Sequence, residues 1–250
     1  MRGVRKLVAA ICLVASMVAI GCRPANHPRV RVAVSVFPLY DLVRRIAGPD
    51  ADVTVVLPPG SSLQSWTPPP DASSRIASAS LLVSVGLGLD PWMDTLSSSA
   101  APKAKMLRLG DRVPTITSEN GTVNGYVWMD PQRARLMATA IAEDLSRADS
   151  SHAIAFRDRA SAVDAQLASL DKEIEARTAT WSKHGVVALP ATVAYYAERY
   201  GLQAAHPSAG VNAAPAAEAL LDPLGGTGPG VSTYEELIRF DTAALEPSFR

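Results

Sequence analysis

The sequence predicts an α/β protein made of two parallel-sheet lobes that are joined by a long helix. The first observation is an alternation of β-rich runs with segments of helical periodicity, which is typical of a parallel sheet covered by helices. The second is a stretch from 153 to 181 that contains no Gly or Pro and repeats apolar residues at helical spacing. The third is a return of the strand–helix alternation after that stretch, over fewer residues. The second lobe should therefore be much smaller than the first.

The composition is that of a folded protein without affinity for nucleic acid. The 250 residues include 24 Lys and Arg against 24 Asp and Glu, with 48% hydrophobic and 6% aromatic residues. This proportion allows a packed core and argues against disorder. A formal net charge of zero provides no basic surface for a phosphate backbone. We therefore expect no nucleic-acid partner.

The first 21 residues have the layout of a bacterial export signal. Basic residues precede an uncharged stretch that is shorter than the roughly 20 apolar residues of a membrane-spanning helix. The stretch ends in Ala19-Ile20-Gly21-Cys22, which resembles the lipobox of bacterial lipoproteins. We predict a signal peptide over 1–21, lipidation of Cys22 and a lipid-anchored tether over 22–28. The alternative is a plain signal peptide that is cleaved near Ala25, with Cys22 discarded.

The cysteine count supports the lipobox interpretation. Cys12 falls within the predicted signal peptide, so Cys22 would be the one cysteine that the mature chain keeps. No internal disulfide is then possible, although the predicted compartment is oxidising. We expect a protein on the periplasmic face of the bacterial cell envelope, held at the membrane by its lipid.

The first lobe is predicted over 29–129. Alternating apolar residues and compact β-rich runs indicate its strands, which cover Val30–Val36, Val53–Leu57, Leu81–Val85 and Met106–Leu109. Phe37-Pro38 opens a helix that Gly48-Pro49 ends, and a shorter helical pattern covers Asp71–Ala79. The polar, turn-rich segment 111–125 is expected to be a loop.

A helical connection is predicted over 130–182. Asp130-Pro131 has the form of an N-cap followed by a first-turn proline. The long helix of 153–181 comes next. Charged residues such as Asp171 fall largely outside its apolar stripe, so we expect them to be solvated.

The second lobe is predicted over 183–250. A strand over Gly185–Leu189 precedes a helix over Thr192–Tyr200. Ser232-Thr233-Tyr234-Glu235 has the capping-box pattern of a terminal helix. Ligands of such folds bind between the lobes, where strand ends meet.

The chain carries no recognisable catalytic motif. It lacks a Gly-x-Ser-x-Gly elbow, a Walker A sequence, a His-Glu-x-x-His pair and a paired Cys-x-x-Cys. Its histidines are not spaced as metal ligands on one element. We therefore expect that the protein is not an enzyme, since a hydrolase using Asp130, Asp222 or His184 has no motif behind it.

Six short segments, taken in chain order, resemble the solute-binding lipoproteins of bacterial zinc and manganese ABC transporters. They are Ser35-Val36-Phe37-Pro38-Leu39-Tyr40, then Leu57-Pro58-Pro59-Gly60 with Trp66-Thr67-Pro68, Gly86-Leu87-Gly88-Leu89-Asp90-Pro91-Trp92, Val127-Trp128-Met129-Asp130-Pro131, Tyr195-Tyr196-Ala197-Glu198-Arg199-Tyr200-Gly201-Leu202, and Leu221-Asp222-Pro223-Leu224. The resemblance implies two α/β lobes joined by a long rigid helix, with a metal ion held between the lobes. It also implies an ABC transporter permease as partner.

The resemblance further implies a ligand set, from which this chain departs. The family's metal is held by three imidazoles, one of them sometimes replaced by a carboxylate, and by a carboxylate of the C-terminal lobe, which suits zinc or manganese. This chain has Gln64, Tyr126 and Pro190 at the histidine positions, and Asp222 alone keeps a ligand-capable carboxylate. Pro190 has no side-chain donor, and an amide or a phenol is a poorer ligand than imidazole for Zn²⁺. The candidate metal ligands are Asp222, Tyr126 and Gln64, with His184 as a histidine that could be recruited from nearby.

Two further departures concern the loops and the second lobe. The segment 111–125 contains no histidine, whereas the family carries a histidine-rich loop there. Only 18 residues, Gln203–Leu220, separate the last two matching segments, where family members carry further strand and helix units. The second lobe is therefore predicted to be truncated.

Two functions are compatible with these observations. The first is an extracytoplasmic solute-binding lipoprotein of a zinc or manganese ABC importer, with a degraded metal site. The second is a metal-free scaffold that acts as an interaction or regulatory lipoprotein, or that accepts another small ligand in a pocket lined by Gln64, Trp66, Tyr126 and Trp128. Packing at the hinge is the alternative role of the two tryptophans. No cofactor is expected apart from a bound Zn²⁺ or Mn²⁺.

Overall fold

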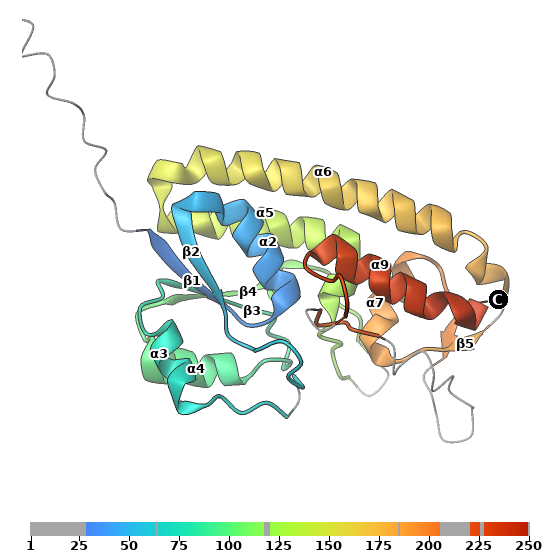
Figure 1. Ribbon diagram of the computed structural model, residues 1–250, viewed down its shortest axis with the longest axis horizontal. Coiled ribbons are helices and arrows are strands. Elements are labelled where there is room, and N and C mark those ends of the chain that lie inside the picture. Colours follow the sequence, from blue (N-terminus) through green and yellow to red (C-terminus); the bar gives the residue numbers. More distant parts are fainter. Residues whose placement is uncertain are drawn as a thin grey trace, which may run out of the picture.

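The structure is a computed structural model that describes residues 29–63, 65–117, 121–184, 186–205, 221–225 and 228–249. The predicted α/β class, with a parallel sheet and a long helix, is confirmed. Figure 1 shows the larger sheet at one end of an elongated molecule and the long helix α6 running along its whole top. The predicted signal peptide and tether lie outside the described residues.

The larger sheet has four parallel strands in the order β2-β1-β3-β4. They are β1 (Val30–Val34), β2 (Ala51–Val55), β3 (Leu81–Ser84) and β4 (Lys105–Arg108). β2 begins two residues before the predicted start because Val30 of β1 already pairs with Ala51. Its hydrogen bonds to the β1 side continue through Leu57, whose amide donates to the Ser35 carbonyl at 3.0 Å. The predicted strand and the observed ladder therefore overlap.

Three helices pack near this sheet, and one of them was not predicted. α2 covers Phe37–Ala47, α3 covers Pro70–Ile76 and α4 covers Trp92–Ala100. α4 buries Trp92, Met93 and Leu96 in its first half and continues into serines, which are poor helix formers. Its short apolar pattern therefore gave no sequence signal. α5 and α6 lie above the sheet in Figure 1, and α3 and α4 lie below it.

The helical connection consists of α5 (Pro131–Ala148) and α6 (Ala153–Thr178). The predicted N-cap is confirmed, because the Asp130 carboxylate accepts a hydrogen bond from the Gln132 amide at 2.8 Å. α6 ends three residues before the predicted end, and Trp181 belongs to a 3-10 turn over Trp181–His184. The two helices pack against each other along α5.

The prediction that Asp171 is solvated was wrong. Asp171 lies on α6 but is only 2% exposed, and its carboxylate accepts hydrogen bonds from Arg199 at 2.6 and 2.8 Å, from Gln132 at 2.5 Å and from Tyr200 at 3.2 Å. Burial favours the neutral carboxyl, but the hydrogen bonds from Arg199 and Gln132 outweigh it and hold the pKa of Asp171 below its usual value. The apolar stripe identifies the face of α6 that meets its neighbours, but an ion pair can be buried at its margin.

The chain after α6 forms a second, two-stranded parallel sheet from β5 (Val187–Ala188) and β6 (Ala204–Ala205). α7 (Ala194–Arg199) lies between the two strands in sequence, and α9 (Tyr234–Leu245) is the terminal helix. The cap of α9 is Thr233, whose hydroxyl accepts from the Glu236 amide at 3.2 Å, one residue later than the predicted box. The residues from 206 to 220 lie outside the described part of the chain.

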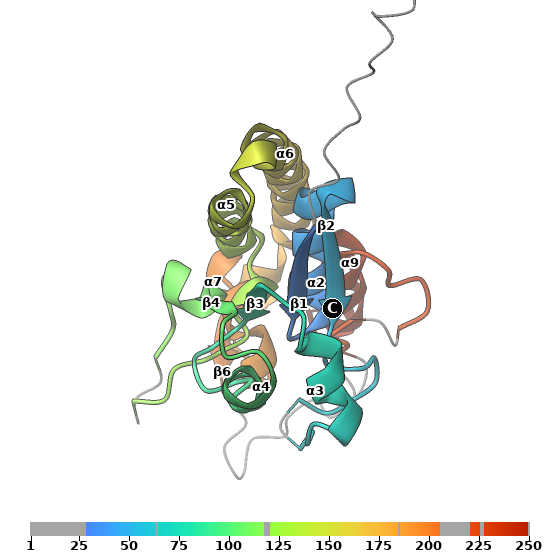
Figure 2. The same cartoon turned by 90° about the vertical axis from the view of Figure 1, so that its left-hand side faces the viewer.

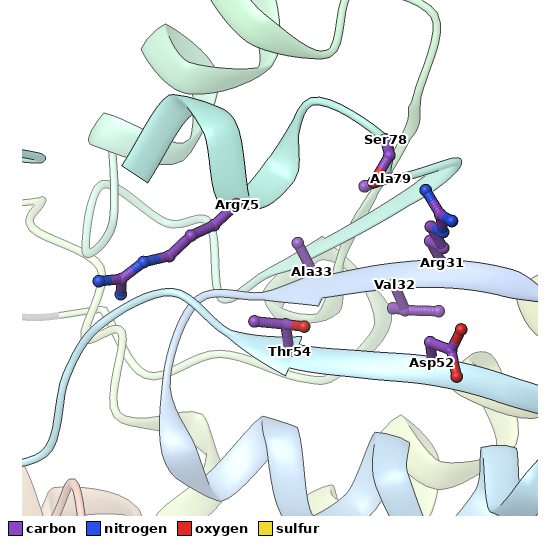
Figure 3. A pocket seen from close by; sticks show the side chains of 8 residues that line it. All are labelled: Arg31, Val32, Ala33, Asp52, Thr54, Arg75, Ser78 and Ala79. Carbon is purple, nitrogen blue, oxygen red and sulfur yellow. The ribbon is translucent and has the colours of Figure 1, made fainter. Parts of the chain in front are cut away.

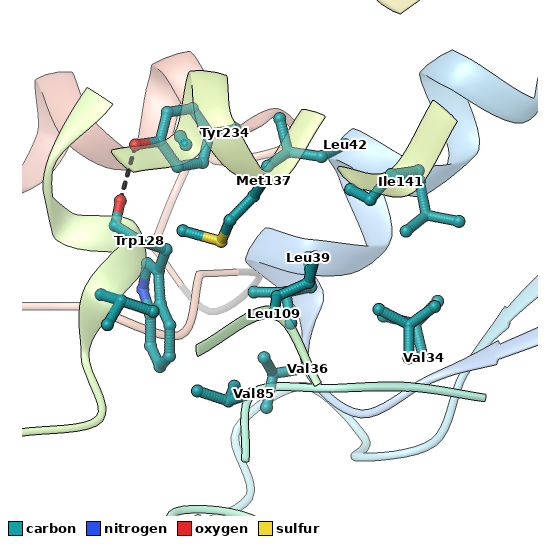
Figure 4. Packing of buried hydrophobic residues seen from close by; sticks show 14 of the residues in the cluster. Val34, Val36, Leu39, Leu42, Val85, Leu109, Trp128, Met137, Ile141 and Tyr234 are labelled. Atoms are coloured by element: carbon teal, nitrogen blue, oxygen red, sulfur yellow. Dashed lines mark hydrogen bonds between the residues drawn. The ribbon is translucent and has the colours of Figure 1, made fainter. Parts of the chain in front are cut away.

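One hydrophobic core joins the sheet to the terminal helix. It runs from Val34 and Leu39 near the large sheet to Trp128 and Tyr234 (Figure 4). The Tyr234 hydroxyl donates a hydrogen bond to the Trp128 carbonyl oxygen at 2.6 Å inside this core. The side chains of Leu39, Trp128 and Tyr234 have no exposed surface. Within the described ranges, no helix combines the length and apolar character that crossing a membrane requires.

Candidate metal site

Two hydrogen bonds link the three described segments that carry candidate ligand positions. Asn124 Nδ2 donates to the Ala191 carbonyl oxygen at 2.6 Å, which brings the segment before Tyr126 against the residue that follows Pro190. Trp128 Nε1 donates to the Pro223 carbonyl oxygen at 2.7 Å, which brings the segment after Tyr126 against the residue that follows Asp222. Gln64 lies outside the described residues. Two hydrogen bonds therefore tie the segment that carries Tyr126 to the segments that carry Pro190 and Asp222.

Tyr126 is held by its neighbours in the loop that precedes α5. Its amide donates to Asn124 Oδ1 at 2.9 Å, and its ring centroid lies 5.2 Å from that of Trp128. A 3-10 turn over Val127–Met129 follows and leads into the N-cap Asp130. These contacts fix the Tyr126 backbone and hold its half-buried ring against Trp128. Pro190 precedes a 3-10 turn in extended conformation and offers no side-chain ligand atom.

Asp222 has a role in the loop between the second sheet and α9. Its Oδ2 accepts from the Gly228 amide at 2.7 Å, and its carbonyl accepts from the Gly225 amide at 2.8 Å. Its own amide donates to Asp241 Oδ1 at 2.7 Å. The carboxylate that the sequence proposes as a metal ligand therefore also holds the turn in which it lies.

Asp241, which was not among the predicted site residues, is a buried carboxyl next to Asp222. It is 0% exposed, and its Oδ2 has no hydrogen-bond partner among the described residues. Burial raises its pKa to about 7, opposed by the hydrogen bond from the Asp222 amide and assisted by the negative charge of Asp222. One sequence signal existed, because Asp241 shares the buried face of α9 with Ile238 and Leu245.

The described residues contain few donors for a divalent metal. No group of three or more His, Cys, Asp and Glu side chains is placed to hold a metal ion within the part of the chain that the structure covers. His184 ends a 3-10 turn, but its side chain is not among the described ones. His152 lies in the turn between α5 and α6, where its Nδ1 is 2.6 Å from Asp149 Oδ2. A donor set of one carboxylate, one phenol and one amide fits zinc or manganese poorly.

The aromatic residues of the alternative pocket are packed into the fold. Trp128 is 0% exposed, and its indole N–H is bonded to the Pro223 carbonyl, which agrees with a packing role beside a proline. Trp66 contacts Trp92 edge to face, with ring centroids 4.5 Å apart. These contacts occupy the two indoles with structural partners.

A separate cavity of about 190 Å³ lies on the face of β1 and β2 next to α3 (Figure 3). Its lining is formed by Arg31, Val32, Ala33, Asp52, Thr54, Arg75, Ser78 and Ala79. In Figure 3 the Arg75 side chain extends away from Arg31, so the two guanidinium groups do not converge on one point. None of the candidate metal ligands lines this cavity.

Comparison with known proteins identifies relatives that cover most of the chain. The family model described as ZnuA, zinc-uptake complex component A, periplasmic, matches residues 32–220. The high-affinity zinc uptake system protein ZnuA of Paracoccus denitrificans is 25% identical over 221 residues, which is 73% of this chain and 67% of the relative. The iron-binding protein YfeA of Yersinia pestis is 22% identical over 198 residues, which is 75% of this chain and 64% of the relative. The chain thus spans about two thirds of the length of these relatives.

Solved structures share the fold at low identity. The Mn-bound periplasmic metal-binding protein from Candidatus Liberibacter asiaticus superposes with a TM-score of 0.74 at 17% identity, covering 89% of this chain and 100% of that chain. Zn(II)-bound AdcA from Streptococcus pneumoniae gives a TM-score of 0.72 at 20% identity, covering 88% of this chain and 58% of that chain. The family model matches well over half of the chain, and we conclude that this protein belongs to the ZnuA family of periplasmic metal-binding solute-binding proteins, which are not enzymes.

Proposed function

We propose that this protein is the extracytoplasmic solute-binding lipoprotein of a zinc or manganese ABC importer, with a degraded metal site. The observation that supports the proposal is a pair of hydrogen bonds that tie the segment carrying Tyr126 to the segments carrying Pro190 and Asp222. None of these three positions is a histidine. On this proposal the scaffold keeps these segments in contact, and the ligand chemistry differs from that of the family.

The metal ion is the cargo, and Asp222, Tyr126 and Gln64 are the residues proposed to hold it. Asp222 would supply the negative charge, although its Oδ2 already accepts from the Gly228 amide at 2.7 Å. A metal must therefore share or displace that hydrogen bond. Loss of interactions one step removed from the metal typically costs about 10- to 100-fold in affinity. Loss of the imidazoles themselves should weaken binding further than this.

The proposed organisation follows the sequence. Residues 1–21 would be a signal peptide, Cys22 the lipidated first residue and 22–28 the tether to the membrane. The first lobe would span 29–129, the helical connection 130–182 and a truncated second lobe 183–250. Among the described residues, the second sheet pairs Val187–Ala188 with Ala204–Ala205, in keeping with a reduced second lobe. The lipid would hold the protein on the periplasmic face beside an ABC transporter permease.

Isothermal titration of residues 23–250 with Zn²⁺ and with Mn²⁺ tests the proposal. Metal is first stripped with a chelator, and folding is verified by circular dichroism. We expect heat of binding that Asp222→Ala abolishes and that Asp94→Ala leaves unchanged. Asp94 is the matched control because it is a half-exposed aspartate on α4 that pairs with Arg108. Binding that survives Asp222→Ala would refute the assignment of the site.

A second candidate function is a metal-free scaffold that acts as an interaction or regulatory lipoprotein, or binds another small ligand in the cleft. It is favoured by the structural use of the Asp222 carboxylate in its own turn. Titration of the folded chain without any heat from either metal would support this function over the first.

A further inference from the structure

The chain enters the fold at one end of the molecule. Arg29 is the first residue that the structure describes, and β1 begins at the next residue. In Figure 1, β1 and β2 lie toward one end of the molecule, and α7 and β5 lie toward the other. In the proposed function the lipid is attached to Cys22, seven residues before Arg29. Seven extended residues reach at most about 25 Å, so the lipid would hold this end beside the membrane.

Basic side chains lie where two strands begin at this end. The Ser80 amide donates to the Arg31 carbonyl of β1 at 2.9 Å, and the Lys105 amide of β4 donates to the Ser80 carbonyl at 3.0 Å. Arg31 and Lys105 are therefore two strand spacings apart, or about 10 Å between their α-carbons. Lys103 lies in the turn before β4, and all three basic residues are exposed. Positive charge thus gathers at the edge of the sheet where the strands begin.

The start of α6 lies at the same end and adds an exposed apolar side chain. His152 precedes α6, and its Nε2 is 3.6 Å from Oδ1 of Asp50, which directly precedes β2. Figure 2 faces this end and shows α6 above β2. Ile154, in the first turn of α6, is 70% exposed. Because the Cα–Cβ bonds of a helix tilt toward its N-terminus, Ile154 projects toward this end. Arg157 follows one turn later on the same face and is exposed.

The charge of these basic side chains is not neutralised by the carboxylates around them. Those carboxylates bond other side chains, in the pairs Asp52–Arg29, Asp50–Arg159 and Asp149–His152. Four cations form no side-chain hydrogen bond or ion pair with any residue that the structure describes, namely Arg31, Lys103, Lys105 and Arg157. The exposed Asp158 beside Arg157 offsets part of their charge. An excess of positive charge therefore faces outward at this end.

We propose that this end is a membrane-binding surface that contacts anionic phospholipid headgroups. Its residues, here called the basic edge, are Arg31, Lys103, Lys105, Ile154 and Arg157. Basic side chains are attracted to an anionic leaflet, and an apolar side chain among them can enter the interface. The inference goes beyond the proposed function and rests on it only for the location beside a bacterial membrane.

The basic edge would also orient the protein. Removal of residues 1–21 takes away Arg2, Arg5 and Lys6, so 21 basic residues remain against 24 acidic ones. The rest of the surface is therefore acidic on balance and is repelled by an anionic leaflet. With the basic edge on the bilayer, β5 and α7 at the other end point away from it (Figure 1).

Sedimentation of residues 23–250 with lipid vesicles tests the proposal. This chain contains all described residues and lacks Cys22, so its binding reports the protein surface and not the anchor. One vesicle preparation is phosphatidylcholine alone, and the other contains one third phosphatidylglycerol. We expect binding to the anionic vesicles only. It should weaken when salt shortens the Debye length from about 30 Å at 0.01 M to about 8 Å at 0.15 M.

Two double variants of equal net charge locate the surface. Each basic residue near an anionic leaflet typically strengthens binding by about 5-fold, so Lys103→Gln plus Lys105→Gln should weaken it by about 25-fold. Lys172→Gln plus Lys183→Gln is the matched control and should change it far less. Lys172 lies about 27 Å along α6 from Ile154, and Lys183 lies in the turn after that helix. Equal weakening by the two double variants would overturn the proposal.

The apolar contact and the nature of the anion are tested in the same assay. Ile154→Ser should weaken binding, whereas Val186→Ser should not, because Val186 is 66% exposed but lies before β5 at the other end. Inorganic phosphate should compete no better than sodium chloride of equal ionic strength. Specific displacement by phosphate would indicate a site for a free anion and would overturn the membrane surface, as would equal binding to neutral vesicles. Circular dichroism verifies that each variant is folded.

The outcome is separable from that of the metal titration, because vesicle binding requires neither a metal ion nor the lipid on Cys22. Binding to anionic vesicles without heat from Zn²⁺ or Mn²⁺ removes the importer function and keeps the membrane surface. Heat of metal binding in a chain that does not sediment with anionic vesicles keeps the importer function and removes the membrane surface.

Discussion

Replacement of Asp241 by Asn should change how the stability of the protein depends on pH. The Asp241 carboxyl is 0% exposed, and its pKa is raised to about 7 by burial. In the unfolded chain the same carboxyl ionises at its usual value of 3.8. At a pH between these two pKa values, the Asp241 carboxyl must take up a proton when the chain folds, and above the higher value folding buries its negative charge. The variant carries no charge at this position in either state.

The sign and size of the effect come from the two pKa values. Because the folded pKa is raised, the stability contributed by the neutral carboxyl is complete below pH 3.8 and is lost as the pH rises to about 7. A difference of about 3 pKa units corresponds to roughly 4 kcal/mol at about 1.4 kcal/mol per unit, as an order of magnitude. We expect the free energy of unfolding of Asp241→Asn to exceed that of the native chain increasingly from pH 4 to 7, and by a constant amount above.

The Asn side chain keeps the acceptor of the Asp222 amide and places an N–H where Asp241 Oδ2 has no described partner. A protonated carboxyl also places a donor in this pocket. Any penalty for an unsatisfied donor therefore shifts the variant's free energy of unfolding by the same amount at every pH and does not change its slope against pH. Urea denaturation of residues 23–250 at five pH values between 4 and 8 measures both curves. Parallel curves would refute the assignment of a raised pKa to this carboxyl.

Three other substitutions test separate parts of the fold by urea or thermal denaturation. Asp171→Asn removes the buried carboxylate that lies 2.6 Å from Arg199 and should cost about 3 kcal/mol of unfolding free energy at pH 7. Because the pKa of Asp171 is lowered in the folded state, this loss should shrink as the pH falls below 3.8. The pH dependence is thus opposite to that of Asp241→Asn. Thr233→Ala removes the N-cap of α9 and should cost about 1 kcal/mol, seen as a lower midpoint of thermal unfolding. Gly225→Ala should cost about 1 to 3 kcal/mol of unfolding free energy, since φ is +66° and the added Cβ would lie 2.6 Å from Phe37 Cδ1. An unchanged stability would show that the loop adjusts to the added Cβ without cost.

Periodicity predicts the long amphipathic elements of the structure. β1, α2 and α6 lie where alternating or helical apolar patterns place them, because each buries one face against the same core. α4 escaped prediction because its second half consists of small polar residues that packing, not propensity, holds in a helix. Prediction from pattern therefore succeeds for long amphipathic elements and weakens for short ones.

The candidate site was predictable only in part, for a different physical reason. The resemblance supplied Tyr126, Pro190 and Asp222, and the structure brings their segments together. Asn124 and Asp241 were not predicted, because their roles consist of hydrogen bonds to residues distant in sequence. A periodic pattern indicates which residues of one element are buried. It does not indicate which carbonyl or amide, distant in sequence, a polar residue will bond. The ligand roles of Asp222, Tyr126 and Gln64 stay predictions until the titration is done.

The altered ligand set limits what a metal ion can do to this fold. A ligand can shift a conformational equilibrium only by the difference between its affinities for the two states. Moving a two-state receptor from about 1% to about 99% of one state takes roughly a 10,000-fold preference. Tyr126 and Pro190 stand where the resemblance implies imidazoles, so an ion held weakly at these positions could not drive such a shift. The arrangement of these segments therefore depends on hydrogen bonds within the protein, such as those of Tyr195 and Asn124.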